Sequence, residues 1–334
     1  MIKLKKEKKT EAKTEKEKIE ERREEILANG RKFKYPIQYA KHKTVFYTII
    51  ISVVAMVVLV VLGWAMLFKI QNTGDVIYRI TRVLPVAVAK VDGEDVRFSD
   101  YLMIYRSSLR AIEQQSGQLG SGEEAEMVRR DYKRGALDNA EEYTFALKLG
   151  KELGIEVTDE EVENAFNEHR KVGGVERSEE SFLKIISDNF GLSKDEYKRL
   201  LLLSLTKEKV EEKIDEKANR AASEVERILG ENGGDFMDVK GKMGDEVQYE
   251  ETGGLVDNKN IDGGRASAAA KLEAGAQSGK FISSNGDGYY FVKLVSKTAT
   301  QVDYVSLKIP FSEFGKRMQK NREEGKIQEK IELQ

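Results

Sequence analysis

Few side chains of this chain could carry covalent or metal chemistry. The 334 residues include no cysteine and only two histidines, His42 and His169, which lie far apart in the sequence. These counts exclude thiol nucleophiles, disulfides, cysteine-ligated zinc and iron–sulfur clusters, and they argue against a two-histidine catalytic centre. No nucleotide-binding motif is present either. We therefore expect no cofactor and no resident metal ion.

An uncharged apolar segment divides the chain into two parts of opposite charge. Residues 1–44 contain 15 Lys or Arg and 8 Asp or Glu, a net charge of +7, so the remainder carries −9 of the total of −2. As a helix, the 24 uncharged residues 45–68 would be about 36 Å long, enough to cross a hydrocarbon core of about 30 Å. Buried core helices and signal peptides are rarely apolar over this length. We predict a retained transmembrane helix.

The distribution of basic residues predicts the orientation of this segment. Lys69 alone follows it closely, whereas a basic cluster precedes it. The cluster consists of Arg31, Lys32, Lys34, Lys41 and Lys43. The positive-inside rule then predicts a single-pass type II protein of the cell membrane, with a cytoplasmic N-terminus and an extracytoplasmic body. The negative charge of the body argues against nucleic acid as a partner.

The first half of the body has the pattern of amphipathic helices. A hairpin over 86–98 precedes helices predicted over 99–114 and 123–153, and another long helix is predicted over 194–229. Side chains that can cap helix N-termini mark several starts. They are Ser99, Thr158 with Glu161, Ser178, and Ser193 with Glu196.

From Gly230 the composition becomes rich in glycine, and strands are predicted over 289–295 and 302–309. Residues 311–331 have the pattern of a further amphipathic helix. The expected fold class is therefore a single N-terminal transmembrane helix, then a mostly α-helical domain and a small α+β domain.

The order of these segments and two motifs resemble the SurA-type N-terminal chaperone domain. The motifs are PVAVAKVDGEDVRFSDYLMIYR at 85–106 and GIEVTDEEVENAF at 154–166. The resemblance is to membrane-anchored or lipid-anchored foldases of the PpiD and PrsA kind. It implies a surface of several helices that binds unfolded or nascent polypeptides, and a C-terminal helix that returns to complete the domain.

Aromatic and methionine side chains are the candidates for such binding, because they make weak and adaptable contacts. We expect at least half of them to form the domain core instead. The candidates are Met103, Tyr105, Tyr132, Tyr143, Phe145, Phe166 and Phe182.

The glycine-rich half resembles a parvulin-type peptidyl-prolyl isomerase (rotamase) domain. Parvulins use a pair of histidines, a nearby Asp or Cys, and apolar walls around the proline ring. At the matching positions this sequence has Tyr290, Ser306 and Asp245, and the aromatic wall falls on the alanine-rich segment 266–270. We expect the isomerase activity to be lost. The matching segments are ASEVERILGENGGDF (222–236), KMGDEVQYEETGGL (242–255), LEAGAQS (272–278) and GYYFVKL (288–294).

We interpret the protein as a membrane-anchored extracytoplasmic chaperone that holds secreted or membrane proteins without ATP, close to a translocon. Two alternatives stay open: an active parvulin-type peptidyl-prolyl cis-trans isomerase, in which Asp245, Tyr290 and Ser306 would be catalytic, and a membrane-tethered adaptor for a single partner. The expected segments are a charged cytoplasmic tail (1–44), a transmembrane helix contacting the lipid bilayer (45–68), a spacer (69–84), a SurA-like helical chaperone domain (85–217), a parvulin-like domain (218–310) and a C-terminal helix (311–334).

Overall fold

The computed structural model divides the chain into two compact units, residues 1–71 and 72–334. It describes residues 16–27, 29, 36–172, 175–260, 262–283 and 286–333, without the side chains of 36–42. Much of the predicted cytoplasmic tail lies outside the described residues.

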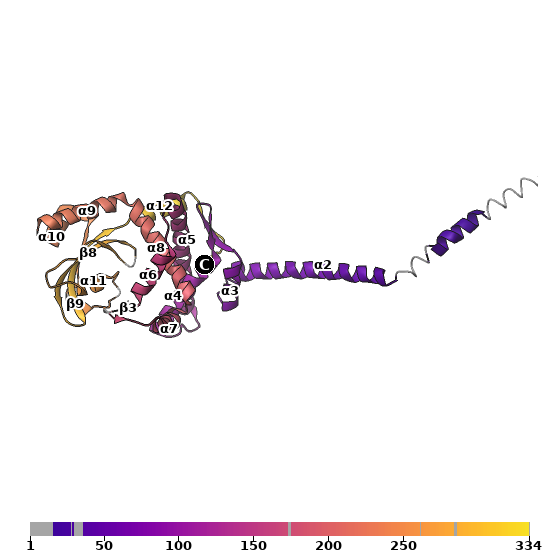
Figure 1. Ribbon diagram of the computed structural model, residues 1–334, viewed down its shortest axis with the longest axis horizontal. Coiled ribbons are helices and arrows are strands. Elements are labelled where there is room, and N and C mark those ends of the chain that lie inside the picture. Colours follow the sequence, from indigo (N-terminus) through magenta and orange to yellow (C-terminus); the bar gives the residue numbers. More distant parts are fainter. Residues whose placement is uncertain are drawn as a thin grey trace, which may run out of the picture. The chain divides into compact units, whose positions relative to one another are not determined.

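The first unit contains the apolar helix. Residues 16–27 are helical, and α2 (Pro36–Trp64) continues into one π-helical segment, η1 (Ala65–Lys69) (Figure 1). Within the described residues, Lys43–Lys69 is the one helix long and apolar enough to cross a membrane. The predicted apolar span over 45–68 lies inside it.

The second unit begins with a group of helices that share one core. Phe166 is fully buried there, and its ring makes edge-on contacts with those of Phe182 and Tyr197. The elements are α3 (Asp75–Val83), β1 (Ala87–Val91), β2 (Glu94–Arg97), α4 (Phe98–Ser116), α5 (Glu123–Leu153), α6 (Asp159–His169), β3 (Lys171–Val172), β4 (Val175–Glu176), α7 (Glu179–Phe190) and α8 (Lys194–Ile214).

Three of the predicted helix caps are present. Thr158 and Ser193 form capping boxes at the starts of α6 and α8, and Ser178 accepts the N–H of Ser181 at 3.3 Å. The prediction that Ser99 caps α4 is wrong. Strand β2 runs directly into α4, and Phe98 donates its N–H to the carbonyl of Val86, so Ser99 is buried within the first helical turn.

The long helix predicted over 194–229 is in fact two helices. Asp215 leaves the helical conformation with φ −90° and ψ 72°, and it separates α8 from α9 (Glu216–Glu231). Its carboxylate accepts the N–H of Ala218 at 3.0 Å and so caps α9. An aspartate competes with the backbone for hydrogen bonds and therefore favours a helix start over a helix interior.

An antiparallel sheet follows, with strands in the order β5-β9-β8-β7 and β6 paired to β9. The predicted strands over 289–295 and 302–309 are confirmed as its two long central strands, β8 and β9. The elements are α10 (Phe236–Met243), η2 (Gly244–Glu246), β5 (Gln248–Glu251), β6 (Val256–Asp257), α11 (Arg265–Ala270), β7 (Phe281–Ile282), β8 (Gly288–Lys297) and β9 (Gln301–Pro310).

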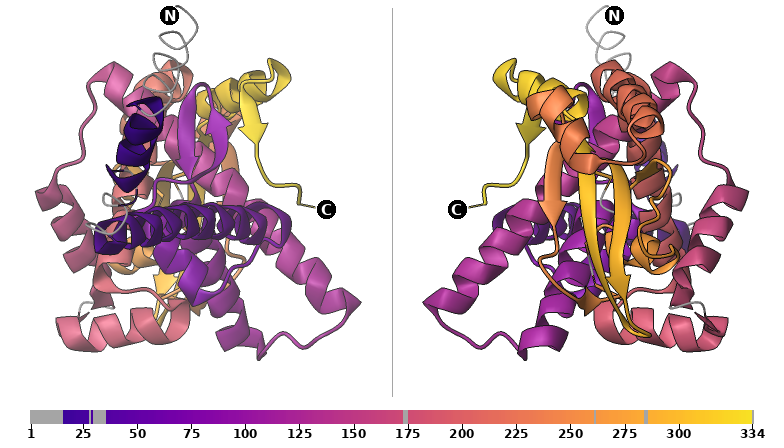
Figure 2. Two further views of the ribbon diagram at one scale, coloured as in Figure 1. Left: turned by 90° about the vertical axis from the view of Figure 1, so that its right-hand side faces the viewer. Right: turned by 90° about the vertical axis from the view of Figure 1, so that its left-hand side faces the viewer.

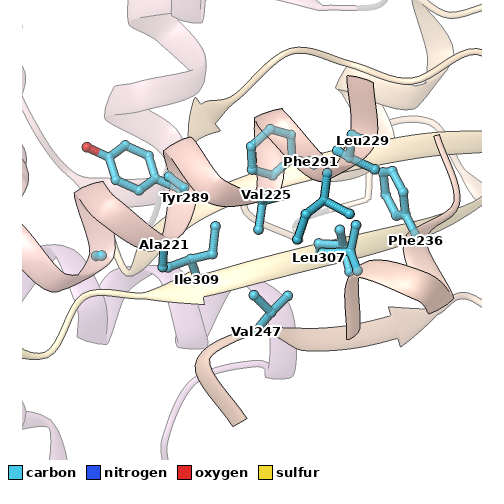
Figure 3. Packing of buried hydrophobic residues seen from close by; sticks show 13 residues of the cluster. Ala221, Val225, Leu229, Phe236, Val247, Tyr289, Phe291, Leu307 and Ile309 are labelled. Carbon is cyan, nitrogen blue, oxygen red and sulfur yellow. The ribbon is translucent and has the colours of Figure 1, made fainter. Parts of the chain in front are cut away.

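The two faces of this sheet bury different helices, because successive side chains of a strand point to opposite faces. Phe291 and Leu307 pack against α9 and α10, as Figure 3 shows for Val225 and Leu229 of α9. Val292, one residue further along β8, lies on the opposite face with the alanines of α11. The sheet is thus covered on both sides.

After the sheet, the chain returns to the helices. Strand β10 (Ile327–Glu329) pairs antiparallel with β1, and the ring of Phe314 in α12 (Glu313–Glu323) lies 5.4 Å from that of Phe145 in α5. The prediction of one helix over 311–331 is wrong in its extent. The helix ends at Glu323, and Gly325, with φ +68°, turns the chain into the strand.

Candidate polypeptide-binding site

The three polar residues considered for catalysis do not form one site. Tyr290 and Ser306 lie on the sheet face that carries α11, where Tyr290 pairs with Lys308 and Ser306 with Val292 in neighbouring register. Asp245 is exposed in η2 and lines a cavity of about 190 Å³ at the start of α9, on the opposite side of the sheet. The sheet separates Asp245 from the other two.

Tyr290 is held in a network of charged side chains. Its hydroxyl donates to Asp287 at 3.3 Å, and Lys308 forms an ion pair with the same carboxylate. The guanidinium of Arg265 lies 5.3 Å from the ring centroid. Burial raises the pKa of Tyr290 above its ordinary value, so the phenol keeps its proton at neutral pH.

The space over this sheet face is filled by the backbone and small side chains of α11. Ala266 and Ala269 are fully buried against Val292 and Leu294. Ser306 is 1% exposed, and its hydroxyl has no hydrogen-bond partner among the described residues. The segment in which the resemblance places the aromatic wall is thus a short helix of buried alanines.

Most of the aromatic candidates for polypeptide binding are core residues. Tyr132 and Tyr143 are half-buried, whereas the other five are nearly inaccessible. These are Met103, Tyr105, Phe145, Phe166 and Phe182. The expectation that at least half form the core is confirmed, and these five are not free surface contacts.

A helical hairpin provides a more open apolar surface. Residues 108–135, here called the arm, comprise the end of α4, a loop and the first turns of α5, and none of these residues is buried. Figure 2 shows the hairpin projecting from the neighbouring helices. Its half-buried and exposed apolar side chains are Leu109, Ile112, Leu119, Met127, Val128 and Tyr132.

Arg129 holds the loop of the arm in place. Its guanidinium donates to the carbonyls of Leu119 at 3.0 Å and Gly120 at 2.8 Å, and it forms an ion pair with Glu126 at 2.8 Å. Gly117 and Gly122 have φ of +87° and +138°, conformations that favour glycine. The arm is therefore an ordered hairpin rather than a loose loop.

Two grooves flank the base of the arm. One, of about 300 Å³, lies between α4 and α5 and includes Tyr132. The other, of about 410 Å³, lies between α4, α7 and the segment before α3, and Leu109 and Phe190 give it apolar walls beside the largely buried Tyr105. Arg106, Arg110 and Glu113 add charged groups to its rim. This mixture of apolar walls and peripheral charge suits an extended polypeptide with a variable sequence.

The comparison with protein families identifies the helical half. The model of the SurA-like N-terminal domain matches residues 38–217. The chain belongs to this family. No curated protein and no solved structure matches it. The SurA-like region extends from the apolar helix to the break at Asp215, and it includes the arm and both grooves. Membership indicates a chaperone-type function, since SurA-like domains bind unfolded polypeptides.

Sequence reasoning alone missed most of the candidate binding surface, the arm and its two grooves. Of the predicted aromatic residues, only Tyr132 lies on the arm. A signal was present in the loop SGQLGSG at 116–122, which joins a 19-residue helix to one of 31 residues, the longest of the SurA-like body. Within the described residues, no group of three His, Asp or Glu side chains could hold a metal ion.

Proposed function

We propose that this protein is a membrane-anchored extracytoplasmic holdase, which binds unfolded secreted or membrane proteins without ATP. The observation that carries the proposal is the arm, a hairpin of 28 residues with no buried position inside a SurA-like domain. Half-buried apolar side chains together with the exposed Met127, on a hairpin that projects from the neighbouring helices, favour an interaction surface. Met127, 56% exposed, adds a flexible and polarisable contact.

The membrane arrangement is part of the same proposal. Helix α2 would cross the bilayer, with the basic N-terminal segment in the cytoplasm and residues 72–334 outside, close to a translocon. The excess of basic residues before the apolar helix supports this orientation. Unfolded clients would then meet the arm as they emerge from translocation, and a holdase outside the cytoplasm would bind them without ATP.

The sheet segment, which resembles a parvulin, would contribute to the scaffold and not to isomerisation. Prolyl isomerisation has a barrier of about 18–20 kcal/mol, and its catalysis requires a pocket that holds the proline ring. The buried Ser306, the engaged Tyr290 and the distance in the fold to Asp245 support the absence of such a pocket. The sheet segment would hold the SurA-like helices in place through its two connections to them, α9 before the sheet and α12 after it.

Substitution of an arm residue tests the holdase proposal. We expect Met127→Ser in the detergent-solubilised full chain to suppress aggregation of an unfolded client about fivefold less well, because losing about 1 kcal/mol of apolar contact weakens binding by that factor. Met237→Ser is the matched control, since Met237 is 59% exposed on α10, outside the arm. Equal suppression by the two variants would contradict the assignment of the arm.

A parallel assay of prolyl isomerisation separates the alternative functions. We expect no turnover of a short proline peptide above the uncatalysed rate. Clear turnover would establish an isomerase instead. If neither turnover nor suppression of aggregation of several unrelated clients is observed, an adaptor for one folded partner becomes the better interpretation.

A further inference from the structure

Helix α3 presents an apolar stripe that is exposed among the residues the structure describes. Val76, Ile80 and Val83 recur at helical spacing and are 71%, 42% and 82% exposed. Leu84, directly after the helix, is 52% exposed. Three of these four side chains are more than half exposed, although contact between apolar surface and water is energetically unfavourable.

The opposite side of α3 is fastened to the helical body. Ile77 and Thr81 are buried, and the hydroxyl of Tyr78 donates to Glu196 in α8 at 2.6 Å. At the start of the helix, Asp75 forms an ion pair with Arg106 of α4. These contacts fix the rotation of α3, so the stripe is presented outward by a rigid support.

The position of α3 in the chain limits what can cover the stripe. Only residues 70–74 separate it from the apolar helix, which ends at Lys69. Such a connection spans at most about 20 Å. Arg79 lies beside the stripe on the exposed surface and supplies a positive charge suited to anionic headgroups. An apolar face flanked by a basic side chain is the pattern of a helix that lies in a membrane interface.

We propose that α3 docks on the surface of the same lipid bilayer that α2 spans, with Val76, Ile80 and Val83 inserted among the headgroups. The inference rests on the proposed membrane span. Residues 73–75 also line the larger groove with Tyr105 and Leu109. Docking of α3 therefore holds this groove at the membrane surface, where emerging polypeptides pass.

Spin labels test the docking in the full chain, reconstituted into vesicles of phosphatidylcholine and phosphatidylglycerol. Because the chain has no cysteine, Val83→Cys gives a unique labelling site. We expect the ratio of collision with oxygen to collision with a water-soluble nickel complex to be several-fold higher at V83C than at the control V295C. Val295 is 52% exposed on β8.

Two outcomes would overturn the proposal. A label at V83C as accessible to nickel as that at V295C would mean that water covers the stripe. A label shielded from both reagents would mean that a protein covers it. Val57→Cys in α2 distinguishes failure of the span itself, because a water-accessible label there would refute the transmembrane assignment on which the docking depends.

Discussion

The carboxylate of Asp215 accepts hydrogen bonds from the starts of two helices, α9 and α12, and its removal should weaken both attachments. The side chain accepts the backbone N–H of Ala218 at 3.0 Å, and also those of Ser312 at 2.6 Å and Glu313 at 2.9 Å. It therefore caps α9 and anchors the start of α12, where the chain leaves the sheet and returns to the helices. Asp215 itself is 3% exposed.

We expect Asp215→Ala to lower the free energy of unfolding by about 3 kcal/mol. Loss of the α9 cap costs about 1 kcal/mol. The N–H groups of Ser312 and Glu313 lose their acceptor at half-buried positions, and each costs about 1 kcal/mol, the lower end of the range for unsatisfied donors. Asp215→Asn keeps one acceptor oxygen and should lose about half as much.

Urea unfolding followed by circular dichroism, in detergent, measures these changes. Asp245→Ala is the matched control, because this exposed aspartate lines the same cavity and should change stability by less than about 0.5 kcal/mol. Amide hydrogen exchange gives a local readout, and the N–H groups of residues 312 and 313 should exchange faster in D215A. Unchanged exchange there, with a stability loss no larger than that of D245A, would refute the reasoning.

The ionisation of Asp215 also predicts how stability changes at acidic pH. Burial by itself raises the pKa of this carboxyl, but the backbone donors, Ser312 first, outweigh it and hold the pKa below the ordinary 3.8. The ionised form is thus favoured by folding, and its contribution is complete above the unfolded pKa of 3.8. The contribution is lost as pH falls through the lower folded pKa, so D215A should flatten the loss of stability in that acidic window.

Two further predictions concern buried residues of α5 and α12. One is Phe314 of α12, and the other is Glu141 of α5, which is 0% exposed and lies 3.5 Å from the guanidinium of Arg322 in α12. Phe314→Ala should lower the free energy of unfolding by about 3–5 kcal/mol, because the buried ring packs on Phe145. Phe190→Ala, at a 38% exposed position, should lower it much less. Urea unfolding compares the two variants, and equal losses of stability would contradict the packing argument. Burial raises the pKa of Glu141 to about 7 from 4.5, so the folded protein retains a proton that the unfolded chain releases, and stability should fall by up to about 3 kcal/mol as pH rises through this window. Glu141→Gln should remove that part of the pH dependence and leave the similar share of Glu211; an unchanged profile would show that Glu141 ionises normally.

Local patterns in the sequence predict the local elements well. The apolar run over 45–68, the capping boxes at Thr158 and Ser193, and the two strands around the Tyr290 and Ser306 positions all depend on residues close together in the chain. Their physical causes are helical and strand periodicity and short-range hydrogen bonds. Such causes act within a few residues, so they can be read directly from sequence.

The long-range contacts depend on partners that local pattern does not identify. From the sequence, an aromatic side chain of a helix fits the core and the surface equally well. In the folded protein Phe145 packs on Phe314, about 170 residues away in the chain, whereas Tyr132 lies on the arm. Likewise, local pattern does not reveal that Ser306 faces α11 whereas Asp245 lies on the α9 side of the sheet.

The sequence by itself determined the apolar helix, the charge difference across it, the helical and glycine-rich halves, and the absence of thiol chemistry. Only the tertiary structure decided that β10 pairs with β1, that residues 108–135 stay unburied, and that one face of α3 is exposed within the described part of the chain. The physical reason is that burial belongs to pairs of surfaces. An apolar stripe in a sequence predicts that this surface will be buried against another apolar surface. Whether the same chain provides that second surface depends on the tertiary structure.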